Sequence, residues 1–194
     1  RLVAAANQGF VTVDQSVAFA RQVEGCLAWL EQPALADNRL AFGEIRKRTD
    51  VKLMADESVH SYWDAELLLE LGGVDFLNLK LMKTGGALEA LRIADMAADR
   101  GVPCQMGSML ENQIGCAACA YTYLAHPNIL TTELCSLGML RETIGSGLIL
   151  ENGNLRVPER PGAGVSVDDD EVARHLVKPS ESTLYHRARS GFPL

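Results

Sequence analysis

Three residues that could carry out chemistry stand at the ends of short apolar runs with nearly even spacing. Glu31 ends one run, Asp56 follows a second and Lys80 follows a third. From position 31 to 56 is 25 residues, and from 56 to 80 is 24. A period near 25, with each apolar run ending in a charged residue, is typical of successive strand–helix units. Glu133 ends a further run, 53 residues after Lys80 and so about two periods on.

Two carboxylates and a lysine suggest a particular chemistry if the strands form a parallel barrel. Residues at the carboxyl ends of such strands meet at one mouth, so Glu31, Asp56 and Lys80 would lie close together. Carboxylates without histidine or cysteine partners suit a hard cation such as magnesium, which can also hold a substrate carboxylate. The lysine could transfer the proton next to that carboxylate while the metal stabilises the developing negative charge. The alternative is that all three are ordinary exposed residues at strand ends.

The elements that would position these residues repeat along most of the chain. We predict strands near residues 1–5, 26–31, 51–56, 76–80, 102–107 and 129–133. Between them we expect a helix capped by Asp14, then helices over residues 37–48, 61–71, 87–100 and 113–124. A closed (β/α)8 barrel needs eight such units in typically about 250 residues. The expected fold class is therefore α/β, a TIM-type barrel that is incomplete, with about six units and the first strands missing at the N-terminus.

The sequence pattern changes after about residue 148. Residues 150–155 predict a hairpin with an Asn152-Gly153 turn, and residues 168–176 predict a short helix that begins with acids. The remaining residues, 177–194, read as irregular. We therefore divide the chain into a partial barrel over 1–149 and a C-terminal segment over 150–194.

Composition excludes several classes of function. The net charge of −7 and the lack of a basic run argue against nucleic-acid binding. No apolar stretch approaches the roughly 18 residues of a membrane span. The five cysteines are an odd number without framework spacing, which predicts a reducing, cytoplasmic location. Cys116 and Cys119 form a lone CxxC in a run of small residues, for which we favour helix packing over metal or redox chemistry.

Six short segments make the chain resemble the barrel domain of the enolase superfamily, in its mandelate racemase/muconate lactonizing branch and nearest the muconate cycloisomerase-like subgroup. They stand in the family's order and spacing, and the resemblance covers residues 1 to about 165. The segments are Ala-Asn-Gln-Gly-Phe at 6–10, Glu-Gln-Pro at 31–33, Ala-Asp-Glu-Ser at 55–58, Asn-Leu-Lys-Leu-Met-Lys-Thr-Gly-Gly at 78–86, Gly-Ser-Met-Leu-Glu at 107–111 and Thr-Glu-Leu at 132–134.

The resemblance implies a magnesium-dependent enzyme, with manganese as a substitute, that removes the proton α to a carboxylate and forms an enediolate. It places Glu31 and Asp56 on the metal and makes Lys80 an acid/base or a cation that stabilises the enediolate. Glu133 is similar to the eighth-strand acid of muconate cycloisomerase-like members. Three residues are expected at the mouth as substrate contacts: Ser108, Met109 and Glu111. Packing for Met109 and a helix-terminal role for Glu111 are the alternatives.

Two departures from the family pattern matter as much as the matches. Such proteins carry an aspartate, the first metal ligand, two residues before the asparagine of the 6–10 segment, and here that position is Ala5. The Lys-x-Lys pair of the second barrel strand, which supplies the opposing base, does not occur in this sequence. The N-terminal capping domain is also expected to be missing, and residues 150–194 resemble the part that returns to it. We expect the chain by itself to be inactive.

Our hypothesis is an isomerase of cycloisomerase or epimerase type that acts on a small carboxylate substrate. A full-length form is expected to be a homo-oligomer that binds neither nucleic acid nor membrane. One alternative is a non-catalytic or degenerate barrel, suggested by Ala5 and the missing lysine pair. Another is a lyase of the same superfamily, either a dehydratase or an enzyme similar to o-succinylbenzoate synthase.

Overall fold

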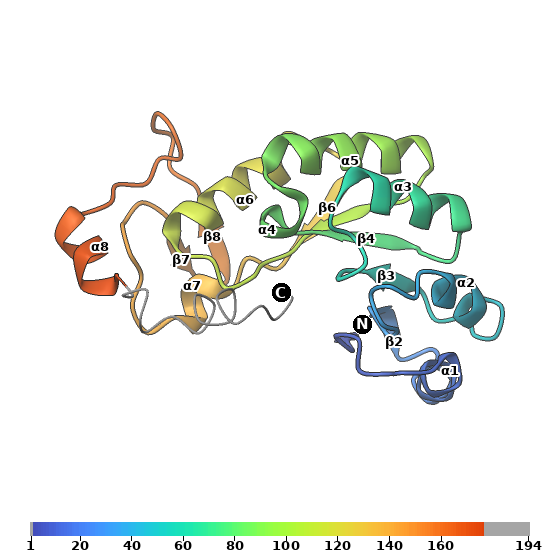
Figure 1. The fold of residues 1–194 in the computed structure, drawn as a ribbon. Coiled ribbons are helices and arrows are strands. Elements are labelled where there is room, and N and C mark those ends of the chain that lie inside the picture. The colour runs from blue at the N-terminus through green and yellow to red at the C-terminus, as the bar shows by residue number, and fades with distance from the viewer. Residues whose placement is uncertain (1, 177–194) are drawn as a thin grey trace, which may run out of the picture.

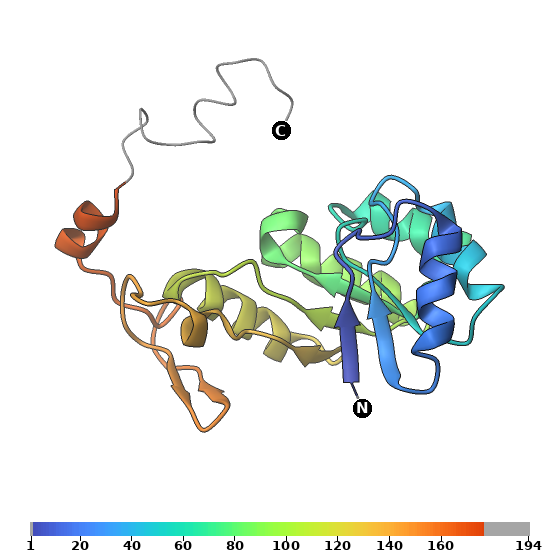
Figure 2. The same cartoon turned by 90° about the horizontal axis from the view of Figure 1, so that it is seen from below.

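A computed structural model describes residues 2–176 of the chain. Its main feature is a six-stranded sheet in which every pair of neighbouring strands is parallel. In sheet order the strands are β1 (Leu2–Ala5), β2 (Leu27–Glu31), β3 (Leu53–Ala55), β4 (Phe76–Leu79), β5 (Cys104–Met106) and β6 (Ile129–Thr132). The sheet curls around part of a barrel axis (Figures 1 and 2). The predicted strands and the predicted class of an incomplete α/β barrel are confirmed.

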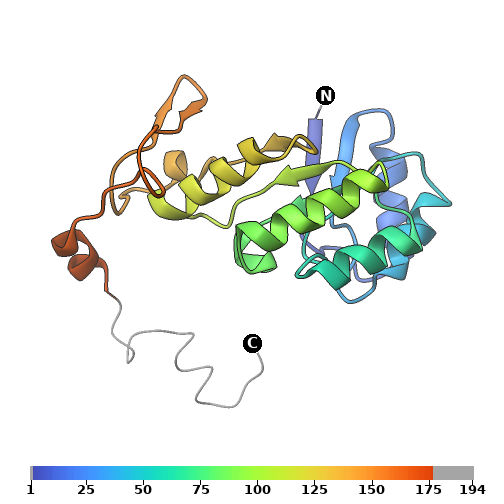
Figure 3. The ribbon, with the colours of Figure 1, turned by 90° about the horizontal axis from the view of Figure 1, so that it is seen from above.

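Helices connect the successive strands and cover one side of the sheet. They are α1 (Val13–Gln22), α2 (Leu40–Arg46), α3 (Tyr62–Leu71), α5 (Ala87–Asp99) and α6 (Gln113–Ala125). Figure 3 shows α3, α5 and α6 lying along the outside of the curl. Two one-turn helices, α4 (Leu81–Thr84) and α7 (Ser136–Met139), follow β4 and β6 and were not predicted. Because all six strands run in the same direction, the loops that lead from each strand to the following helix lie along one edge of the sheet.

Two helix starts differ from the sequence prediction. The N-cap of α1 is Thr12 and not Asp14, because Thr12 Oγ1 accepts from Gln15 N at 3.2 Å and Gln15 Oε1 accepts from Thr12 N at 3.1 Å. This reciprocal capping box satisfies two N–H groups that a helix leaves free at its start. Helix α2 is shorter than the predicted span 37–48 and begins at Leu40 without a side-chain cap.

The two faces of the sheet bury different kinds of side chain. Leu30, Leu53 and Leu77 point toward the helices and are fully buried in the main core. Side chains alternate along a strand, so Trp29 and Glu31 share the opposite face. There the rings of Trp29 and Phe76 lie 5.0 Å apart between centroids, below a polar layer at the strand ends. The inner face is therefore apolar toward the amino ends of the strands and polar at the carboxyl ends.

The C-terminal part contains the hairpin and the helix that the sequence predicted. Strands β7 (Ile149–Glu151) and β8 (Asn154–Arg156) are antiparallel, and the turn residues Asn152 and Gly153 have φ values of 51° and 75°. Two positive φ angles define the type I′ turn that Asn-Gly favours. Helix α8 (Asp169–His175) begins after Asp168, whose side chain accepts from two backbone N–H groups. The irregular segment predicted for 177–194 lies outside the described residues.

All five cysteines are free thiols, and three of them are buried. Cys104, Cys116 and Cys119 are buried free thiols, and Cys116 Sγ donates to the backbone oxygen of Glu111 at 3.3 Å. This arrangement supports the packing interpretation of the CxxC pair. Across residues 2–176 no helix has both the length and the apolar character that crossing a membrane requires.

Candidate active site

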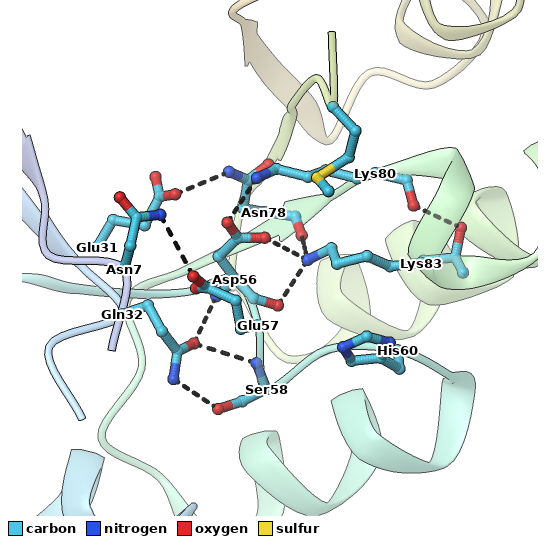
Figure 4. A network of polar contacts seen from close by, with 12 residues as sticks. Asn7, Glu31, Gln32, Asp56, Glu57, Ser58, His60, Asn78, Lys80 and Lys83 are labelled. Carbon is cyan, nitrogen blue, oxygen red and sulfur yellow. Dashed lines mark hydrogen bonds and ion pairs between the residues drawn. The ribbon is translucent and has the colours of Figure 1, made fainter. Parts of the chain in front are cut away.

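The charged residues at the ends of three neighbouring strands come together at the carboxyl edge of the sheet (Figure 4). Glu31 is the last residue of β2, while Asp56 and Lys80 directly follow β3 and β4. Glu133 follows β6 at the same edge, where its N–H donates to Met106 O at 3.1 Å. The predicted convergence of the two carboxylates and the lysine is thus what the fold produces.

Asp56 is the centre of this cluster and is 1% exposed. Lys80 Nζ donates to Asp56 Oδ2 at 2.6 Å, and Lys83 Nζ contacts Asp56 Oδ1 on the other side. Burial alone would raise the pKa of Asp56, but the adjacent Lys83 and Lys80 ammonium groups outweigh burial and hold the pKa below its usual value. Asp56 is therefore a carboxylate with two counter-ions.

Glu31 has the opposite electrostatic environment. Its Oε1 accepts from Asn78 Nδ2 at 3.2 Å, and no lysine or arginine of residues 2–176 forms an ion pair with it. Burial, together with the negative charges of Asp56 and Glu133, raises the pKa of Glu31 to about 7. A buried carboxylate without a cationic partner is a site where a bound cation would be strongly favoured.

Lys80 and Glu133 also respond to this environment. Burial opposes the charge on Lys80, but its hydrogen bond to Asp56 and its attraction to that carboxylate raise the pKa of Lys80. Burial raises the pKa of Glu133, and the charge of Lys80 opposes this in part. Paired in this way Lys80 is an ammonium, and the single hydrogen-bond partner of its Nζ within residues 2–176 is Asp56.

Two further residues that fix Asp56 were not singled out from the sequence. Lys83 lies on the single turn α4, whose N-cap residue is Lys80, and the ammonium groups of both lysines contact Asp56. Gln32 is fully buried, and its Oε1 accepts from Asp56 N at 2.9 Å and from Ser58 N at 3.1 Å. Its Nε2 donates to Ser58 Oγ at 2.8 Å, so Gln32 ties the end of β2 to the loop after β3. Both residues stand within segments that carry the family resemblance, 31–33 and 78–86, but neither was given a role there.

Because Gly107 has no side chain, the side chains of Asn78 and Lys80 can lie directly beside it. A Cβ atom at position 107 would lie 2.2 Å from Asn78 Oδ1 and 2.9 Å from Lys80 Cε. Both distances are below ordinary contact, so a side chain here would push against the lysine. Glycine at this position is thus part of the construction of the site.

The residues expected to contact substrate lie in the loop after β5. Glu111 is buried, its Oε2 accepts from Ser108 Oγ at 2.8 Å and its Oε1 accepts from Met109 N at 2.8 Å. Ser108 Oγ also lies 3.2 Å from Ser136 Oγ. The Glu111 carboxylate therefore braces its own loop, and Met109 is half exposed. Substrate contact by Ser108, Met109 and Glu111 stays a prediction.

The donor atoms at this mouth fit a hard cation in kind, but the set of ligands is short. Ala5 pairs with Glu31 in the parallel register of β1 and β2, and its methyl group cannot bind a metal. No group of three or more His, Cys, Asp and Glu side chains in the described part of the chain could hold a metal ion. Magnesium is often bound by only one or two carboxylates with several waters. Glu31 and Asp56 would supply these two.

A curled parallel sheet with charged residues at the carboxyl ends of its strands places the protein in the (β/α) barrel class, whose active sites lie at that mouth. Comparison with known proteins then gives the family. Residues 1–172 match a family model described as enolase C-terminal domain-like. The chain therefore belongs to this family, within the mandelate racemase/muconate lactonizing branch of the enolase superfamily.

Individual relatives share the fold but differ in the reactions that their names give. The chain is 34% identical over 144 residues to N-succinyl-L-Arg/Lys racemase of Bacillus cereus, covering 74% of this chain and 39% of the relative. It is 34% identical over 197 aligned positions to o-succinylbenzoate synthase of Geobacillus kaustophilus, covering 96% of this chain and 49% of the relative. The chain thus spans at most about half the length of these relatives.

A solved structure adds a bound metal to the comparison. Dipeptide epimerase from Cytophaga hutchinsonii, complexed with Mg and the dipeptide D-Ala-L-Val, matches with a TM-score of 0.83 and 28% identity. The match covers 88% of this chain and 47% of that one.

Proposed function

We propose that this mouth takes part in the removal and return of the proton α to a carboxylate, as in a racemase, epimerase or cycloisomerase. The observation that carries the proposal is the contact of 2.6 Å between Lys80 Nζ and Asp56 Oδ2, with Glu31 on the neighbouring strand. Glu31 and Asp56 would hold Mg²⁺, or Mn²⁺ in its place. When bound, the metal supplies Lewis-acid stabilisation of the substrate carboxylate as negative charge develops.

Lys80 is the residue that would exchange the proton. As an amine it takes the proton from the α-carbon, and the C–H electron pair stays on the substrate as an enediolate. As an ammonium it returns a proton to the same face or stabilises the enediolate charge. The present pairing with Asp56 favours the ammonium, so Lys80 becomes a base only when Asp56 Oδ2 has another partner. Inversion of the carbon needs a second group on the opposite face.

The substrate is proposed to be a small carboxylate. One relative is named as a racemase of N-succinyl-L-Arg/Lys, and one similar structure holds the dipeptide D-Ala-L-Val. N-succinyl amino acids and dipeptides both carry a carboxylate next to an acylated amine. Glu133 is close enough to influence the pKa of Glu31 and lies on the far side of Lys80 from β1, where it could contact such a substrate. We also propose that the full-length protein forms a homo-oligomer and is located in the cytoplasm.

A lyase is the second candidate. It is supported by the share of this chain that aligns with a lyase relative. The match to o-succinylbenzoate synthase extends over 96% of this chain, against 74% for the racemase. The two candidates differ in product, because a dehydrating lyase changes the mass of its substrate and an isomerase does not. The non-catalytic alternative rests on Ala5, which leaves the mouth with two carboxylate ligands.

The test is exchange of the α-proton in D₂O. The natural polypeptide that carries these residues would be incubated with Mg²⁺ and a panel of N-succinyl amino acids, dipeptides and muconolactone, and followed by ¹H NMR and mass spectrometry. The α-proton signal is expected to disappear as the proton exchanges with deuterium. When EDTA is added, or in Lys80→Met, the signal should persist. Exchange that survives in Lys80→Met, or no exchange with any member of the panel, would sink the proposal.

A further inference from the structure

Lys83 and Lys80 contact the same carboxylate in different ways. Helix α4 starts directly after Lys80, and Lys83 N donates back to Lys80 O at 2.9 Å. Gly85 ends this single turn with a φ of 84°, a left-handed conformation that glycine adopts without strain. The turn therefore fixes the two ammonium groups on opposite oxygens of Asp56 (Figure 4).

All three donors of the Lys83 ammonium are used by the protein. A lysine ammonium has three N–H donors and no acceptor. Lys83 Nζ contacts Asp56 Oδ1 and donates to Asp56 O at 2.5 Å and to Asn78 O at 3.0 Å. Its side chain is 7% exposed. No donor is left for a substrate, whereas Lys80 has one described partner and two donors to spare.

We propose that Lys83 is a positioning residue, which fixes the Asp56 carboxylate so that only Oδ2 is offered to Lys80 and to a metal ion. Its three contacts join the loop after β3 to the backbone of β4, at Asp56 O and Asn78 O. Oδ1 is occupied, so the carboxylate cannot rotate without losing this bond. Lys83 thereby assigns the two oxygens of Asp56 to different tasks. The inference deepens the proposed function and rests on it only where metal binding is measured.

Measuring metal affinity in a variant without Lys83 distinguishes a positioning role from a purely electrostatic one, because the two roles predict opposite changes in affinity. Removing a cation from beside a metal ligand should tighten metal binding by Coulomb's law. Losing the orientation of that ligand should weaken it, by about 10- to 100-fold for a residue that braces a ligand. Lys83→Met and Lys83→Arg would be compared by Mn²⁺ titration with EPR detection. Arginine keeps the charge but places its donors in a planar fork, so both variants are expected to bind more weakly.

A matched control distinguishes positioning from general loss of structure. Arg46, the last residue of α2, and Asp75, which directly precedes β4, form a partly buried ion pair at the amino edge of the sheet, away from the mouth. Arg46→Met should lower the melting temperature and leave the Mn²⁺ affinity of the folded protein unchanged. Tighter or unchanged Mn²⁺ binding in Lys83→Met, at a melting temperature like that of Arg46→Met, would overturn the proposal.

A second measurement needs neither metal nor a folded variant. In ¹⁵N-lysine-labelled protein, the Lys83 ammonium should exchange its protons with water slowly, at least tenfold more slowly than Lys80, because every donor is bonded and buried. Equal rates for the two lysines would contradict the assignment. If the unmodified protein binds no Mn²⁺, the proposed metal function fails, while the exchange rates still decide the role of Lys83.

Discussion

Lys80 Nζ lies 2.6 Å from Asp56 Oδ2, and both side chains are more than nine-tenths buried. The pair joins the ends of two adjacent strands, and Lys83 adds a second cation to the same carboxylate. A buried charge is stable only while its partner is present, since an uncompensated ion in the interior loses its hydration. We therefore expect the carboxylate of Asp56 to be needed for folding as well as for the proposed chemistry.

Replacing Asp56 by asparagine should destabilise the protein. The change leaves two buried ammonium groups without a negative partner, and breaking a buried pair typically costs about 3 kcal/mol or more. Urea unfolding followed by circular dichroism would measure the free energy of unfolding. The control is Asp14→Asn, which removes a mostly exposed pair with Arg48 and should change stability by less than about 1 kcal/mol. Equal losses in the two variants would refute this role of Asp56.

Stability should fall as pH rises through the range in which Glu31 titrates. Its pKa is about 7 in the folded protein against an ordinary value of 4.5, so between these values the folded state holds a proton that the unfolded state has released. Linkage then lowers the free energy of unfolding with rising pH, by a total on the order of 3 kcal/mol. In metal-free buffer, Glu31→Gln should remove this decline between pH 5 and pH 8.

The control for this pH effect is a glutamate that lies in solvent. Glu70 is exposed on α3, so Glu70→Gln should keep the full decline of stability with pH. A decline of the same size in Glu31→Gln would show that another group is responsible.

Most of the fold and the centre of the site could be predicted because both depend on local pattern. Apolar runs with a period near 25 residues mark the strands, and parallel strands necessarily bring their carboxyl ends together. That geometry alone places Glu31, Asp56 and Lys80 at one mouth. The cap of α1 was missed although its signal was present, since Thr12 has Gln15 three residues later and Asp14 has no such partner.

The supporting residues could not be predicted in the same way. Lys83 donates to two backbone oxygens and Gln32 accepts from two backbone N–H groups, and backbone groups carry no sequence signature. Which backbone atoms meet a side chain depends on strand register and on the turn that follows β4. Likewise, the need for glycine at 107 depends on Asn78 and Lys80 from the neighbouring strand.

Replacing Gly107 by alanine should harm both stability and the site. The added Cβ would overlap Asn78 Oδ1 and crowd Lys80 Cε, and overpacking of this kind costs about 1–3 kcal/mol. The matched control is Gly43→Ala on α2, where the nearest atom would be 3.8 Å away and alanine favours the helix. Differential scanning calorimetry should show a lower melting temperature for Gly107→Ala only. A melting temperature equal to that of the unmodified protein would mean that the loop after β5 moves freely.

Restoring a carboxylate at position 5 should strengthen metal binding. Ala5 pairs with Glu31 across β1 and β2, so Ala5→Asp would add a third oxygen donor beside Glu31 and Asp56. We expect at least tenfold tighter binding of Mg²⁺, about 1.4 kcal/mol, by isothermal titration calorimetry. Val3→Asp is the control, because residue 3 lies on the same face of β1 but further from the mouth. If both variants gain equally, the effect is one of net charge. If Ala5→Asp gains nothing, Glu31 and Asp56 do not form a metal site, and the non-catalytic interpretation of this barrel takes precedence.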